Sequence, residues 1–175
     1  EQLLSISARA VFAANQAVRE AAAESEAYQN MGTTLVAAVS YAGGTVVTNV
    51  GDSRAYHVTR EGITRVTKDH SLVERMVDRG DITAEEARRH PSRNLITRAL
   101  GPDADAQCDG YICPMESGEY LLLCTDGLVN TVTDQEMLFE VIHGAEPDTS
   151  LDRMLEIAKK QGAPDNVTAV LMRKL

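Results

Sequence analysis

The feature that most constrains this chain is the unbroken apolar run Leu121–Cys124, which Thr125, Asp126 and Gly127 follow directly. The run is too short for a useful helix and has glycine on both sides, so it predicts a strand that is buried on both faces. Such a strand delivers Asp126 to its end, where Gly127 permits a sharp turn. A carboxylate at the end of a dry strand is costly unless a positive charge neutralises it. A bound divalent metal ion is one interpretation, and an ordinary Asp-Gly turn is the other.

Two other stretches present an aspartate in the same way. Asp52 follows Gly51 at the end of the β-branched run 45–50, and Asp165 lies in a Gly- and Pro-containing loop just before a predicted strand at 166–172. If these strand ends meet at one edge of a sheet sandwich, the three carboxylates repel one another and raise each other's pKa. A hard dication with oxygen ligands, Mg²⁺ or Mn²⁺, removes that repulsion. The three aspartates together therefore predict an oxygen-ligated metal site.

Composition excludes several classes of protein. The chain has 175 residues, which suits one domain, and its 43% hydrophobic and 25% charged content is typical of a globular protein. The net charge of -9 argues against a nucleic-acid partner, because no basic stripe is present to neutralise phosphates. No apolar run is long enough to cross a membrane. The three cysteines fit no zinc pattern, and we interpret them as reduced thiols of a cytoplasmic protein.

The order of the predicted elements indicates an α+β fold. An amphipathic helix is predicted over residues 2–28, with an apolar stripe that includes Leu3, Ile6 and Val11 and that we expect to pack on a sheet. The other predicted elements are strands at 33–41, 45–50, 54–59, 63–67, 94–100, 108–113, 119–125 and 166–172, and helices at 71–79, after Thr83, after Thr133 up to about His143, and at 151–160. This order fits antiparallel sheets packed together with helices outside, and not a doubly wound sheet or a helical bundle.

Several motifs, taken in order, resemble a known family. They are Met31 to Leu35, Val50 to Arg54 with its Gly-Asp-Ser-Arg, Lys68 to Ser71, His90 to Gly101, Thr125 to Leu128, and Gly162 to Thr168 with its Asp-Asn-Val-Thr. The set resembles the bacterial branch of the PPM-type (PP2C-like) protein phosphatases, and the resemblance runs through essentially the whole chain. It implies a single-domain α-β-β-α sandwich of two antiparallel sheets. It also implies metal-dependent hydrolysis of phosphoserine and phosphothreonine in proteins.

The same resemblance implies roles for individual residues. Asp126 and Asp165 match catalytic ligands of a central metal pair, and Asp52 matches a ligand of a third, weaker ion that shares Asp126. Two to three Mn²⁺ or Mg²⁺ ions are implied for the complete enzyme. Residues 70–97 match a flap that lies beside the active site and affects substrate choice. Phosphorylated proteins, and the Ser/Thr kinases that this activity opposes, are the implied partners of a monomeric enzyme.

Other residues are expected to support the site or to stand outside it. Gly127 permits the close approach at Asp126, and Asn166 is expected to hold the Asp165 loop with side-chain hydrogen bonds. For Arg54, an ion pair within the site and a simple surface pair both remain open. Cys124 has no expected nucleophilic role, because a reactive thiolate needs exposure and a cationic neighbour. Asp69 is expected to cap the helix that starts at Leu72, and His70 and His90 are interpreted as loop residues.

One departure from the family pattern matters for activity. Nothing in the chain matches the family's N-terminal strand pair, which holds a phosphate-gripping Arg and an Asp-Gly motif whose Asp bridges two metals. We therefore expect an N-terminally truncated phosphatase domain that binds metal weakly and is catalytically impaired in isolation. The alternative is a regulatory module that keeps the fold and binds phosphoproteins without hydrolysing them.

Overall fold

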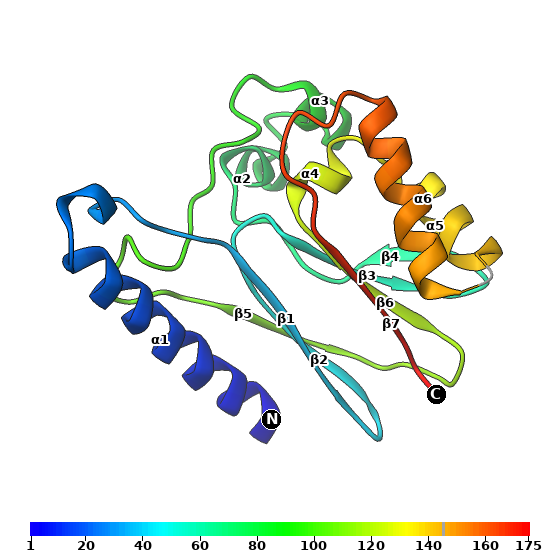
Figure 1. Ribbon diagram of the computed structural model, residues 1–175, viewed down its shortest axis with the longest axis horizontal. Helices are drawn as coiled ribbons and strands as arrows, with labels where there is room; N and C mark the ends of the chain where they lie inside the picture. The colour runs from blue at the N-terminus through cyan, green and yellow to red at the C-terminus, as the bar shows by residue number, and fades with distance from the viewer. Residues whose placement is uncertain (145) are drawn as a thin grey trace.

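Two antiparallel sheets pack face to face, with helices on both outer faces (Figure 1). The structure is a computed structural model that describes residues 1–144 and 146–175. The first sheet has the order β1-β2-β5, and the second has the order β4-β3-β6-β7. The strands are β1 (Leu35–Tyr41), β2 (Gly44–Val50), β3 (Arg54–Val58), β4 (Ile63–Arg65), β5 (Asp109–Cys113), β6 (Tyr120–Cys124) and β7 (Ala169–Arg173).

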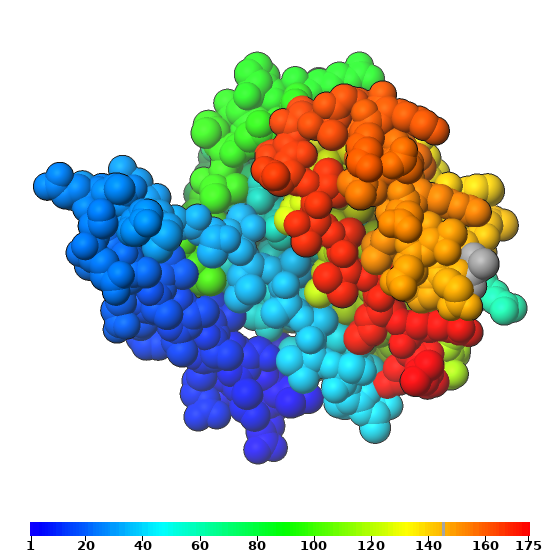
Figure 2. All heavy atoms as spheres, in the orientation of Figure 1, coloured from blue at the N-terminus to red at the C-terminus, as the bar shows by residue number. Residues whose placement is uncertain are grey.

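Helices complete the two outer layers. Helix α1 (Gln2–Ala23) lies along the first sheet, whereas α5 (Asp134–His143) and α6 (Pro147–Lys160) cover the second. In the space-filling view, α1 and the α5–α6 pair lie on opposite sides of the molecule (Figure 2). The predicted α-β-β-α sandwich is confirmed. Among the helices that the structure describes, none is long and apolar enough to cross a membrane.

Strand β6 lies inside the second sheet, as its apolar sequence predicts. It pairs with β3 through Tyr56↔Leu122 and with β7 through Leu122↔Leu171. Leu121 and Leu122 are both fully buried, and because neighbouring side chains of a strand point to opposite faces, they enter different core layers. The burial of both faces follows from having the other sheet on one side and helices on the other.

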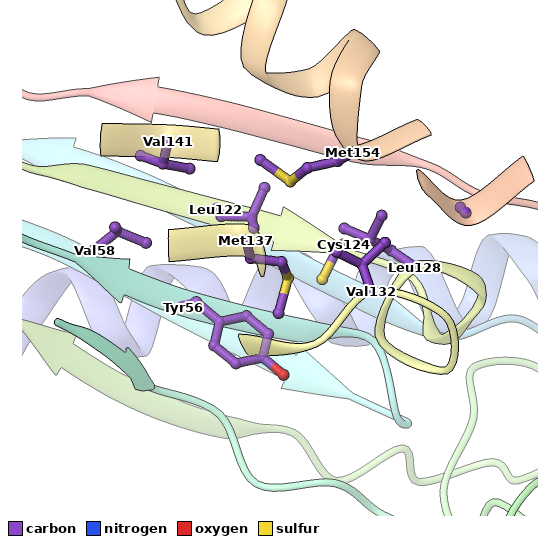
Figure 3. Packing of buried hydrophobic residues seen from close by; sticks show 10 residues of the cluster. Tyr56, Val58, Leu122, Cys124, Leu128, Val132, Met137, Val141 and Met154 are labelled. Atoms are coloured by element: carbon purple, nitrogen blue, oxygen red, sulfur yellow. The ribbon is translucent and has the colours of Figure 1, made fainter. Parts of the chain in front are cut away.

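The core has three parts, which correspond to the three interfaces of the sandwich. Between the second sheet and its helices, Tyr56, Leu122 and Cys124 belong to one buried cluster with Met137 and Met154 (Figure 3). Val47, Leu121 and their neighbours fill the space between the sheets, and Val11, Val50 and Leu100 join α1 to the first sheet. Full burial of a Leu or Val side chain stabilises the fold by roughly 1.5–3 kcal/mol, so these layers hold the sheet edges in place.

Helix α1 differs from its prediction. It ends at Ala23, and a separate 3₁₀ turn, η1 (Glu26–Tyr28), follows. Val11 is its one buried apolar residue, whereas Ile6 is 44% exposed despite its place in the predicted stripe. The second buried residue is Asn15, whose Oδ1 accepts a hydrogen bond from the Gly101 N–H at 2.7 Å. The hydrogen bond from Gly101 to Asn15 therefore helps to hold the helix against the rest of the protein. Apolar periodicity does not predict this polar contact.

The segment between strands β4 and β5 contains two short helices. Helix α2 (Leu72–Arg79) ends at Gly80 with φ +75°, and α3 (Ala84–Arg89) opens with the predicted capping box at Thr83. Two expectations here are wrong. Ser71, not Asp69, caps α2, and residues 94–100 form isolated bridges instead of a strand. The assignment of residues 70–97 as a flap stays a prediction.

The C-terminal third also contains an element that was not predicted. Residues Asp126–Val129 form a short helix, α4, where a turn was expected. Helix α5 has the predicted capping box at Thr133, while α6 begins at Pro147, earlier than predicted. Proline is favoured in the first turn of a helix because its missing N–H has no partner there in any case. Strand β7 starts at Ala169, so Asp165 lies in a longer loop than predicted.

Candidate metal centre

Asp126 lies where strand β6 becomes helix α4. Thr125 is the N-cap residue and Asp126 is the first helical residue, so its carboxylate lies near the free N–H groups of the helix. The backbone N–H of Gly127, next to this carboxylate, favours its charged form and lowers its pKa. Burial has the largest effect and acts in the opposite direction, and the nearby Asp165 carboxylate adds to it, so the net pKa of Asp126 is raised.

Thr125 holds the Asp165 loop against the end of β6. Its N–H donates to the Thr168 carbonyl at 3.0 Å, and its hydroxyl accepts from the Thr168 N–H at 3.0 Å. Gly127 permits the approach, because a Cβ at this position would lie 2.2 Å from the Asn166 carbonyl oxygen. These contacts bring Asp165 close enough to Asp126 for the charge of Asp165 to raise the pKa of Asp126.

The Asp165 loop is organised through its backbone. The Asn166 N–H donates to Asp165 Oδ1 at 2.7 Å, and the Asn166 carbonyl lies 3.4 Å from the Thr125 hydroxyl that donates to it. Within the described residues, the hydrogen bonds of Asn166 to the protein come from its backbone, and the side-chain role expected for Asn166 stays a prediction. A backbone tie is available to any residue, which is why residue type did not reveal it.

Asp52 reaches the site from the first sheet. It follows Gly51, whose φ of +107° turns the chain out of β2, and a Cβ there would lie 2.3 Å from Thr34 Cγ2. Burial, followed by the charges of Asp126 and Asp69, raises the pKa of Asp52 to about 6. Asp52 is therefore close to Asp126, as the prediction requires.

The three aspartates form a chain of two electrostatic contacts and not one compact cluster. Asp126 interacts with Asp52 on one side and with Asp165 on the other. Among residues 1–144 and 146–175, no group of three or more His, Cys, Asp or Glu side chains is arranged to hold a metal ion. Two overlapping carboxylate pairs still fit a hard dication, because their oxygens are the ligands it prefers and its charge would relieve their repulsion. Ligation by the three aspartates stays a prediction.

Arg54 forms an ion pair inside the site. Its Nε and terminal nitrogen bind both carboxylate oxygens of Asp69, with the shortest distance 2.6 Å, and a second terminal nitrogen donates to the Tyr56 hydroxyl at 3.2 Å. The Asp69 side chain is only 6% exposed, which excludes the surface-pair interpretation. Because Asp69 accepts this bidentate pair, Arg54 is held beside Asp52 and is not free in solvent.

A cavity of about 320 Å³ opens beside these groups. Asp52, Arg54 and Asp126 line it, together with Val73 and Glu74 of α2, Ala87 and Arg88 of α3, and Arg93 of the loop that follows α3. Asp165 is not among the lining residues and lies exposed at the rim of the site. The lining of the cavity therefore combines the carboxylates of Asp52 and Asp126 with the cationic side chains of Arg88 and Arg93.

Cys124 is not a nucleophile in this arrangement. Its side chain is 2% exposed, and burial raises the pKa of its thiol to about 12. Within the described part of the chain, all three cysteines are free thiols. The expectation of reduced core cysteines agrees with this, except that Cys108 is only partly buried.

Sequence reasoning missed Thr125 and Ser53 as parts of the site. The Ser53 hydroxyl lies 2.9 Å from the Thr34 hydroxyl and joins the Asp52 turn to the start of β1. For Thr125, the available signal was a hydroxyl residue directly before an aspartate at a strand end, a common N-cap arrangement. For Ser53, the partner is a residue far away in the sequence, and no local pattern indicates it.

Comparison with known proteins identifies the family of the chain. Residues 2–172 match the family model described as protein phosphatase 2C. The chain is 38% identical over 153 residues to the serine/threonine phosphatase stp of Listeria innocua, covering 87% of this chain and 61% of that protein. The chain thus spans less than two thirds of the length of that relative.

Solved structures show the same likeness. The crystal structure of the Mycobacterium tuberculosis serine/threonine phosphatase PstP has a TM-score of 0.93 and 35% identity, with 99% of this chain and 70% of that chain covered. A PstP catalytic domain in complex with two manganese ions has a TM-score of 0.83 and 35% identity, with 97% and 70% covered. The extent of the family match and these similarities show that the chain belongs to the protein phosphatase 2C family.

Proposed function

We propose that this chain forms most of the catalytic domain of a metal-dependent protein phosphatase that hydrolyses phosphoserine and phosphothreonine. The observation that carries the proposal is the position of Asp126, which lies between Asp52 and Asp165 and lines a cavity large enough for a phosphorylated side chain. The names of the relatives, serine/threonine phosphatases, support the same reaction class. Phosphorylated proteins, including Ser/Thr kinases and their substrates, are the proposed partners.

Each residue has a defined task in this proposal. Asp126, oriented by the Gly127 N–H, and Asp165, held by the Asn166 N–H, would bind the central cations, and Asp52 would bind a further one. Bound Mn²⁺ or Mg²⁺ would supply charge neutralisation and activation of the attacking water. The manganese ions in the related PstP domain support this choice of cation. Cys124 takes no part, because its buried thiol stays protonated.

The helical wall of the cavity has a proposed role in substrate choice. Helices α2 and α3 belong to residues 70–97, and Arg88 and Arg93 face the cavity from this segment. We assign the segment as the flap that contacts the phosphoprotein. We further propose a cytoplasmic monomer, since free thiols are typical of reducing compartments.

A phosphoprotein-binding module without catalysis is the second candidate. The absence of a three-ligand metal group among the described residues favours it for the isolated chain. The relatives are longer than this chain, and we propose that the part they have in addition completes the donor set. Under this proposal, the isolated chain binds cations weakly and the longer protein is the active enzyme.

One assay separates the two candidates. Hydrolysis of a phosphothreonine peptide is measured as a function of Mn²⁺ for this chain, for the longer protein with the expected N-terminal strand pair, and for the longer protein with Asp126→Asn. Activity is expected only in the second protein. Asp148→Asn is the matched control, because Asp148 is an exposed aspartate on α6 away from the cavity. Mn²⁺-independent activity, or full activity of Asp126→Asn, would refute the phosphatase proposal.

A further inference from the structure

His70 is buried at the point where residues 70–97 leave the sheets, and it binds the turn that precedes Asp52. The Gly51 backbone N–H donates to the ring nitrogen Nδ1 of His70 at 3.1 Å, and the backbone N–H of His70 donates to the Gly51 carbonyl at 2.9 Å. His70 is only 6% exposed and Gly51 is buried, so water does not replace either bond. One residue therefore satisfies both polar groups of Gly51. His70 lies in a loop, as expected, but it is buried and bonded to the Asp52 turn.

Gly51 needs such support because its backbone conformation is unusual. Its φ of +107° lies outside the range that other residues adopt readily, and it packs directly against Thr34. The direction in which Asp52 leaves this turn depends on the orientation of the Gly51 peptide. If the Nδ1 contact were lost, the buried Gly51 N–H would lose its acceptor and the turn would change orientation to find another.

The second ring nitrogen of His70 is also bound. His70 Nε2 lies 3.2 Å from Asp109 Oδ2 on β5 and 3.1 Å from a terminal nitrogen of Arg98, which itself donates to Asp109 Oδ1 at 2.8 Å. Because Nδ1 accepts a hydrogen bond, the neutral ring carries its proton on Nε2 and donates it to Asp109. The Gly51 N–H at Nδ1 and the Asp109 carboxylate at Nε2 both favour this tautomer, in which the Arg98 nitrogen near Nε2 binds Asp109 instead of the ring.

His70 also joins the two ends of the 70–97 segment. The Thr97 N–H donates to the His70 carbonyl at 2.7 Å, and Ser71 forms a bridge with Ile96. A displacement of this segment at its base therefore acts on the same residue that holds Gly51. His70 therefore contacts the base of the 70–97 segment through its backbone carbonyl and the Asp52 turn through its ring.

We propose that His70 is a positioning residue that holds the Gly51 peptide through Nδ1 and thereby aims the Asp52 carboxylate into the cation site. The proposal rests on the proposed function for the role of Asp52 as a ligand. Residues that orient metal ligands typically change metal affinity by about 10–100-fold when they are replaced. Because His70 contacts no cation site directly, its effect depends on the acceptor at Nδ1 and not on charge.

Two substitutions separate the ring nitrogens. The Asn side chain in His70→Asn places an acceptor near the Nδ1 position, whereas the Gln side chain in His70→Gln reaches the Nε2 position and leaves Gly51 N–H without its acceptor. Amide hydrogen exchange at Gly51 and Mn²⁺ binding by calorimetry are measured on the full 175-residue chain. His70→Gln is expected to speed Gly51 exchange at least about tenfold and to weaken Mn²⁺ binding about tenfold, while His70→Asn stays near wild type.

His57→Gln is the matched control, because His57 also places Nε2 beside a carboxylate, Glu119 at 2.8 Å, but lies away from Gly51. Equal Gly51 exchange in wild type, His70→Asn and His70→Gln would overturn the positioning role. Asp52→Asn tests the proposed function separately: if Mn²⁺ binding is unchanged by it, Asp52 is no ligand, whatever Gly51 exchange shows. Should His70→Gln not fold, ¹⁵N NMR of the wild-type ring decides, since a proton found on Nδ1 refutes the proposal.

Discussion

Replacing Gly127 by alanine tests whether close packing of the Asp165 loop creates the acidic pair. The added Cβ would lie 2.2 Å from the Asn166 carbonyl oxygen, about 1 Å short of ordinary contact, and the atom it meets belongs to the backbone. The loop must therefore move away from β6. We expect the two hydrogen bonds between Thr125 and Thr168 to weaken as a result.

The magnitude follows from three contributions. Overpacking at a rigid contact costs about 1–3 kcal/mol. Each weakened hydrogen bond costs about 1 kcal/mol. Alanine offsets about 0.5–1 kcal/mol of this, because Gly127 lies within helix α4 and alanine is the better helix former. The free energy of unfolding of Gly127→Ala is therefore expected to fall by about 2–4 kcal/mol.

The same substitution has an electrostatic consequence. As Asp165 moves away, its charge raises the pKa of Asp126 less, so that pKa falls towards the ordinary 3.8. Urea unfolding measures the stability change, and carboxyl ¹³C NMR titration measures the pKa. Gly62→Ala is the control, since no atom lies within 4 Å of its Cβ position. Equal unfolding free energies for the two variants, or an unchanged Asp126 pKa, would refute the packing argument.

Three further predictions concern charge and the thiols. Asp69→Asn should lower the free energy of unfolding, measured with urea, by about 1–3 kcal/mol, because it breaks the buried ion pair with Arg54. The control Asp78→Asn breaks an exposed pair with Lys68 and should change the free energy of unfolding by less than about 1 kcal/mol. Burial raises the pKa of Asp52 in the folded protein to about 6, above its ordinary 3.8. The ionised carboxylate therefore destabilises the fold at high pH, and this destabilisation is lost as pH falls from 6 towards 3.8 and the group is protonated. Without divalent cations, Asp52→Asn should thus be more stable than wild type by about 1–2 kcal/mol at pH 7.5, after allowance for partial exposure, and by nearly nothing at pH 4; equal differences at both values would contradict the pKa. Iodoacetamide followed by mass spectrometry should label the partly exposed Cys108 in the native chain and leave Cys124 unmodified, and early labelling of Cys124 would show that its burial is wrong.

Local physics made much of the fold predictable. The capping boxes at Thr83 and Thr133 and the glycine end of α2 at Gly80 appear where the sequence predicts them. These signals depend on residues within one or two turns of each other, so they need no knowledge of the rest of the chain. The doubly buried strand β6 was predictable for the same reason, because its apolar run excludes a solvent-facing side.

Errors occurred where distant contacts replaced local preference. Residues 94–100 have a strand-like composition, yet they pair only through isolated bridges, and Asn15 is buried because its side chain binds the Gly101 loop. An Asp-Gly pair predicts a turn, but at Asp126 the chain enters helix α4, whose N-cap residue Thr125 is hydrogen-bonded to Thr168 at the end of the Asp165 loop. Each of these outcomes depends on a partner that is far away in sequence.

The sequence by itself determined that Asp52, Asp126 and Asp165 each stand at a strand or loop end, because apolar runs and glycines determine such ends locally. Only the tertiary structure decided how these carboxylates are related: Asp126 interacts with both others, while Asp165 stays exposed at the rim. It also decided that Arg54 pairs with Asp69. The physical reason is that sheet order and loop-to-strand hydrogen bonds set distances between charges, and these contacts join residues that local patterns treat as independent.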